Sequence, residues 1–134
     1  PQMIINGKAD VVGSRPMDVA KAVMNAKKRT MPVSVNITPV AQGLLVSAAS
    51  HGLQNGTYDL IAVAITPKAE VQIKRGENRG KTIRYVNVVR DFKPIGRLSN
   101  GQARLTVPAV DGAKLAVFVQ AQGQGPIVGA ALQD

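Results

Sequence analysis

The sequence predicts a mainly β protein, an antiparallel β-sandwich preceded by a short ββα segment. From residue 33 onward, apolar residues alternate with polar or small ones, which is the twofold period of a strand with one buried face. A helical period occurs only before residue 31. We therefore place residues 1–30 in the ββα segment and residues 31–134 in a sandwich of roughly seven to nine strands. Turn dipeptides separate the strands of the second part: Asn55-Gly56, Arg79-Gly80, Asn100-Gly101 and Asp111-Gly112.

The first thirty residues are predicted to form a hairpin and a helix. Asn6-Gly7, a dipeptide favoured in type I′ turns, lies between two apolar runs and predicts the hairpin. Ser14 is the expected helix cap and Pro16 suits the first turn, which predicts a helix over residues 15–28. A hairpin and one helix cannot enclose a core by themselves. Residues 1–30 are therefore expected to pack either on the β-domain or on a missing N-terminal segment, and the abrupt apolar start of the chain favours the missing segment.

Composition limits the chemistry that the chain can perform. It has 134 residues, 45% of them apolar, with 17 Lys and Arg against 8 Asp and Glu, one His and no Cys. Without cysteine there is no thiol nucleophile and no Fe–S or zinc–thiolate site in these residues. One histidine leaves few metal ligands, so we predict no metal and no cofactor. No apolar run reaches the ~20 residues of a membrane span, and no signal peptide is present in this chain.

The positive charge is concentrated between Lys68 and Arg97, where nine basic residues accompany three acidic ones. Such a cluster favours a polyanion, an anionic surface or an anionic partner. The alternative is a twisted hairpin whose charged face blocks edge-to-edge pairing. Aromatic residues for base stacking are nearly absent, so there is no specific nucleic-acid signal. The candidate binding residues are Lys74, Arg75, Glu77, Asn78, Arg79, Lys81, Arg84, Asn87 and Arg90.

Two features of this basic hairpin allow sharper expectations. Glu77 is placed to pair with Arg75 or Arg79 and so hold the connecting loop. Asn87 lies on an otherwise apolar strand face together with Tyr85. If Asn87 is buried it needs hydrogen-bond partners, either from a backbone loop or from a ligand.

The single histidine, His51, is interpreted as a turn residue. The competing interpretation is a hydrolase, because Ser47, Ser50 and Asp59 lie near it in the sequence. Closeness along the chain does not establish the geometry of a catalytic triad.

Both predicted parts of the chain carry a family resemblance, and together the two matches cover nearly the whole chain. Pro1, Asn6, Gly7 and Gly13 resemble the closing ββα segment of a thioredoxin-like domain, in which a cis-proline precedes the strand leading to the Asn-Gly turn. The segments RGENRGKTIRYVNVVR and AVFVQAQGQGPIVGAALQD resemble the C-terminal β-domain of a bacterial secreted family of unknown function whose N-terminal half is thioredoxin-like.

The resemblance implies a periplasmic or secreted protein whose redox cysteine pair lies upstream of Pro1, with Pro1 as the cis-proline beside it. The chain as given is then not an enzyme. It is a non-catalytic accessory β-domain, and thiol–disulfide exchange with a protein substrate belongs to the intact parent. The alternative function is a binding module for an anionic surface or polymer, acting through the basic hairpin of residues 74–90.

Overall fold

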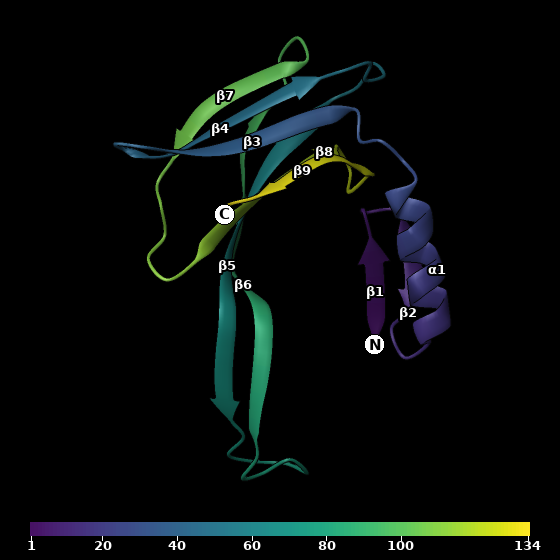
Figure 1. The fold of residues 1–134 in the computed structure, drawn as a ribbon, viewed down its shortest axis with the longest axis vertical. Helices are drawn as coiled ribbons and strands as arrows, with labels where there is room; N and C mark the ends of the chain where they lie inside the picture. The colour runs from purple at the N-terminus through teal and green to yellow at the C-terminus, as the bar shows by residue number, and fades with distance from the viewer.

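The computed structural model describes residues 1–134, and its nine strands and one helix form two parts (Figure 1). The N-terminal part contains β1 (Gln2–Ile5), β2 (Ala9–Val12) and α1 (Pro16–Lys27). The prediction of a mainly β fold with antiparallel sheets is confirmed. The larger part contains β3 (Val33–Val40), β4 (Gly43–Ser50), β5 (Tyr58–Gln72), β6 (Thr82–Arg97), β7 (Gln102–Val107), β8 (Lys114–Ala121) and β9 (Ile127–Leu132).

The larger part is a sandwich of two antiparallel sheets. One sheet has the strand order β3-β4-β7 and the other has the order β6-β5-β8-β9. Their inward residues form one core, whose most deeply buried large side chains are Leu60, Val46, Val117 and Val119. Each such side chain contributes about 1.5–3 kcal/mol when buried. The twofold alternation seen in the sequence therefore selects which residues face the core.

The side of the sandwich is closed where β9 approaches β3. Gly129 of β9 is buried, and a Cβ atom on it would lie 2.5 Å from the carbonyl oxygen of Val33. No side chain fits in that space, so glycine permits the two sheets to meet at this edge.

The N-terminal part has the predicted elements with one correction. Asn6 and Gly7 both have positive φ, and the Lys8 N–H donates to the carbonyl of Ile5 at 3.1 Å, so the hairpin is confirmed. The predicted cap at Ser14 is wrong, because the chain turns once more and Arg15 becomes the N-cap without a side-chain cap bond. The single helix has 12 residues, and no helix has the length and hydropathy needed to cross a membrane.

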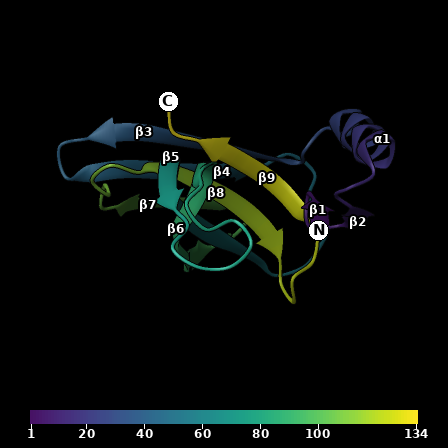
Figure 2. The ribbon, with the colours of Figure 1, turned by 90° about the horizontal axis from the view of Figure 1, so that it is seen from below.

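Strands β5 and β6 are much longer than the rest, and their outer halves extend beyond the sandwich (Figure 1). We call residues 66–90 the arm. Pairing of β5 with β8 ends at Ile65, so the arm consists of two strands alone. Seen from below, along the arm, β1, β2 and α1 lie beside the sandwich next to β9 (Figure 2). The fold therefore has two projections from one compact core.

Candidate functional site

The tip of the arm is a loop closed by backbone hydrogen bonds. Ile73 and Lys81 flank it, with the Ile73 N–H donating to the Lys81 carbonyl at 2.9 Å and the Gly80 N–H donating to the Ile73 carbonyl at 2.8 Å. Gly76 and Gly80 have φ values of 83° and 84°, as a loop of this shape requires. Within the loop, Lys81 Nζ donates to Asn78 Oδ1 at 3.0 Å.

The predicted pairing of Glu77 with Arg75 or Arg79 is wrong. No ion pair involves Glu77, and all three side chains are exposed. Since the backbone bonds already close the loop, an exposed pair between long side chains would add under about 1 kcal/mol while costing side-chain entropy. The loop therefore presents its cations to solvent.

Two basic side chains on the body of the arm have polar partners. Arg84 Nε donates to Glu70 Oε1 at 2.8 Å across the strand pair. Arg90 Nη1 donates to Thr66 Oγ1 at 3.3 Å. Both contacts are exposed, so they orient the side chains more than they stabilise the fold.

Asn87 is not buried, so it has no need of the hydrogen-bond partners that a buried asparagine would require. It is exposed and has a φ of 52°, in the left-handed region. The pairs Thr66–Val88 and Lys68–Val86 place Pro67 opposite Asn87, and a proline has no N–H to donate to the ladder. Asparagine tolerates the left-handed conformation better than most residues. The local backbone therefore accounts for Asn87 without a ligand.

The arm has one apolar and one charged face. Directly opposed residues share a face, so Ala69 with Tyr85 and Val71 with Ile83 form an apolar stripe. Tyr85 is 44% exposed, because no second sheet covers this stripe. The opposite face carries the Glu70–Arg84 pair. The arm thus presents an uncovered apolar stripe beside its basic loop.

Positive charge dominates the arm after its ion pairs are taken into account. Within the span from Lys68 to Arg97, three basic residues are paired with acids: Arg84, Lys93 and Arg97. Glu77 is the one acid of this span without an ion pair. The other six basic residues of this span form no ion pair, and all six lie on the arm: Lys68, Lys74, Arg75, Arg79, Lys81 and Arg90.

His51 has a partner that sequence reasoning missed. Its Nε2 lies 3.0 Å from Ser34 Oγ on the neighbouring strand. Ser50 instead accepts from the Leu53 N–H, and Asp59 pairs with Arg97 at 2.9 Å, so neither completes a triad with His51. The register of β3 with β4 pairs Ser34 with Ala49, two residues before His51. Predicting the Ser34–His51 contact would have required knowing this register. No carboxylate is hydrogen-bonded to this histidine.

Pro1 contributes a structural contact at the other end of the chain. Its carbonyl accepts the Gly13 N–H at 2.7 Å, which ties the end of β2 to the start of β1. The assignment of Pro1 as a cis-proline beside a redox cysteine pair stays a prediction.

Comparison with known proteins identifies relatives by family and by fold. The family model described as "Protein of unknown function (DUF1223)" matches residues 1–120. The crystal structure of the protein AGR_C_4864 from Agrobacterium tumefaciens is similar to this chain, with a TM-score of 0.77 and 21% sequence identity. The similarity covers 99% of this chain and 60% of the other, so the chain spans less than two thirds of that protein's length. No match is found among curated proteins.

Proposed function

Because the chain belongs to the DUF1223 family of proteins of unknown function, we propose that residues 1–30 complete a thioredoxin-like module whose remainder precedes Pro1. The sandwich is then a non-catalytic accessory domain attached to that module. In this proposal the intact protein is periplasmic or secreted, and its upstream cysteines exchange disulfides with a protein substrate. The resemblance of Pro1, Asn6, Gly7 and Gly13 to the closing ββα segment of a thioredoxin-like domain supports the assignment of this module as thioredoxin-like.

The observation that supports this proposal most is the uncovered apolar surface of the N-terminal part. Helix α1 has no buried residue, and its Met17 and Met24 are 82% and 61% exposed. Ile4 and Val12 lie on a shared face of the β1–β2 hairpin, and Ile4 is 58% exposed. Apolar residues on both sides of a two-stranded sheet and its helix are typical of a layer inside a larger domain.

The length comparison gives independent support. The A. tumefaciens protein has residues beyond the 60% that this chain covers. A segment preceding β1 would supply the additional strands and helices that a two-stranded sheet needs for stability. In the proposed arrangement these strands pair with the open edge of the β1–β2 sheet.

The redox part of the proposal is tested on the full-length protein. We expect thiol titration after reduction to find a cysteine pair upstream of Pro1, and that pair to reduce a disulfide-bonded protein substrate. Replacing both cysteines with serine should abolish this activity while leaving the sandwich folded. If the upstream residues contain no cysteine, the redox function is wrong, and the packing proposal is then tested separately.

A second candidate function is binding of an anionic surface or polymer by the arm. Six basic residues without ion pairs on a projecting hairpin support it. Clustered cations gain affinity by releasing counterions from a polyanion, so binding should weaken steeply with salt. The exposed stripe containing Tyr85 would add apolar contact at an anionic membrane.

The test is a salt series with heparin, anionic vesicles and duplex DNA, using the full-length protein. The variant Arg75→Gln/Arg79→Gln should lose at least tenfold in affinity. The matched control Arg104→Gln/Lys114→Gln removes the same charge from exposed sandwich positions and should stay within about twofold. No binding to any of the three ligands excludes this function. If the arm variant instead self-associates, the charges serve to prevent edge pairing.

A further inference from the structure

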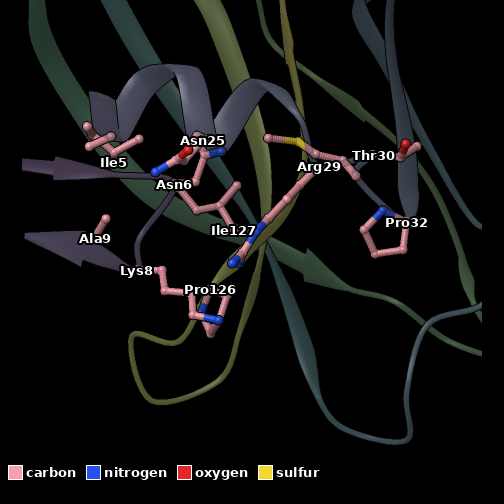
Figure 3. Close-up of a pocket in the computed structure, with 13 residues that line it drawn as sticks. Ile5, Asn6, Lys8, Ala9, Asn25, Arg29, Thr30, Pro32, Pro126 and Ile127 are labelled. Carbon is pink, nitrogen blue, oxygen red and sulfur yellow. The ribbon is translucent and has the colours of Figure 1, made fainter. Parts of the chain in front are cut away.

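A cleft lies between the N-terminal part and the sandwich. It encloses about 490 Å³ and is bounded by the β1–β2 turn, the last turns of α1, the connection to β3 and the loop before β9 (Figure 3). This size falls within the ~300–1,000 Å³ typical of small-molecule sites. The cleft is separate from the arm and from the apolar surfaces discussed above.

Backbone contacts fix the walls of this cleft. The Ile127 N–H donates to the Asn6 carbonyl at 3.0 Å, which joins the hairpin turn to the start of β9. At Gly7 a Cβ atom would lie 2.9 Å from the Gly125 carbonyl oxygen, so the two loops are in close contact. On the other side the His51 N–H donates to the Pro32 carbonyl at 2.7 Å. The cleft is therefore preformed.

The lining separates into an apolar floor and a polar rim. Ile5, Ala22, Ala26 and Ile127 are half-buried and form much of the floor. The exposed rim includes the side chains of Lys8 and Arg29. Figure 3 shows Arg29 extending past Ile127 toward Pro126, with Lys8 approaching from the other side. An apolar floor under a basic rim suits a ligand that is itself amphipathic.

The charge at the rim is not compensated. No Asp or Glu lines the cleft, and neither Lys8 nor Arg29 forms an ion pair. A guanidinium recognises a carboxylate or phosphate through two parallel hydrogen bonds, and an ammonium adds a point charge. The last carbonyls of α1 bring partial negative charge nearby, which weakens the attraction for a bare anion. A ligand that binds here therefore needs apolar contact as well as charge.

We propose that this cleft binds a small amphipathic anion, a carboxylate or phosphate group carrying a short alkyl chain. Arg29 and Lys8 hold the headgroup at the rim, and the chain lies over the floor formed by Ala22, Ala26 and Ile127. Each buried methylene should improve affinity about fourfold. The site is independent of the redox chemistry and of polyanion binding by the arm.

The test is isothermal calorimetry on the full-length protein with octanoate and octyl phosphate below their micelle concentrations. Both should bind, whereas butyrate and octan-1-ol should each bind at least tenfold more weakly. Binding of one eight-carbon anion but not the other identifies the headgroup and supports the site. If neither binds, or if octan-1-ol binds as tightly as octanoate, the proposal is overturned.

Variants locate the binding in the cleft. Lys8→Gln/Arg29→Gln should weaken octanoate at least tenfold, while the matched control Arg104→Gln/Lys114→Gln should change it less than twofold. All four positions substituted in these two variants are exposed, so both variants should fold. Ala26→Leu fills part of the floor without changing charge, and it should reduce the advantage of octanoate over butyrate. An unchanged octanoate affinity in both cleft variants would contradict the proposal.

Discussion

Strands β5 and β6 run through both the sandwich and the arm, yet β5 is buried in the sandwich and mostly exposed on the arm. Residues 60–64 of β5 are all buried, whereas the outer half of that strand is mostly exposed. The change occurs where pairing with β8 ends, at Ile65. Apolar residues occur in both regions, so the burial of β5 follows the presence of β8 beside it rather than its sequence alone.

The largest expected effect of this contrast is on stability. Leu60→Ala in the core should lower the free energy of unfolding by about 2–5 kcal/mol, because it leaves a cavity between two sheets. Val86→Ala on the arm, where Val86 is 71% exposed, should change it by less than about 0.5 kcal/mol. Urea unfolding followed by circular dichroism measures both. Equal effects would mean that the arm is packed against something in the native protein.

Glycine substitutions test the close contact between the two sheets at the edge of the sandwich. Gly129→Ala places a methyl group against the Val33 backbone and should destabilise the fold by about 1–3 kcal/mol. Gly96→Ala is the control, because a Cβ there meets only Leu105 at an ordinary 3.8 Å. In thermal unfolding, Gly129→Ala should have a clearly lower midpoint temperature than Gly96→Ala. A Gly129→Ala protein as stable as the unsubstituted one would show that β3 and β9 can move apart without lowering the free energy of unfolding.

Asn87 tests the account of the arm's backbone. Asn87→Gly should be neutral or slightly stabilising, whereas Asn87→Val should cost about 1–2 kcal/mol locally because a β-branched residue disfavours positive φ. Amide hydrogen exchange in residues 66–90 should quicken only in the valine variant. If both variants lose anionic-ligand binding equally while exchange is unchanged, Asn87 acts through its side chain instead.

The smallest effect is expected at the Arg84–Glu70 pair. Arg84→Ala should reduce stability by under about 1 kcal/mol, since both side chains are exposed. A double-mutant cycle with Glu70→Ala, followed by urea unfolding, isolates the pair. A coupling energy well above about 1 kcal/mol would indicate that the arm is shielded from solvent.

The sequence predicted the sandwich because alternation and Gly turns are local signals. Val33, Val35 and Ile37 alternate with polar residues, and this pattern alone defines the inner face of β3. The pairing of Ser34 with His51 required the register between two strands, which spacing along the chain does not provide. The prediction that Ser14 caps the helix was wrong because the path of the backbone after β2, and not the residue type, determines where the helix begins.

The candidate site was predicted in part. The charge cluster was visible in the sequence, but its projection on a two-stranded arm arises from the lengths of β5 and β6 relative to β8. The Glu77 pairing failed because exposed side chains have many alternatives of similar energy. The cleft lined by Lys8 and Arg29 had no sequence signal, since these residues meet residues about a hundred positions away, near Pro126.

The most direct test of the proposed architecture is methionine oxidation in the full-length protein and in the chain of residues 1–134. If preceding residues cover the N-terminal part, oxidation of Met17 and Met24 by hydrogen peroxide should be at least tenfold slower in the full-length protein. Met31, half-buried in the connection to β3, is the internal control and should change little. Equal oxidation rates at Met17 and Met24 in the two proteins would contradict the account.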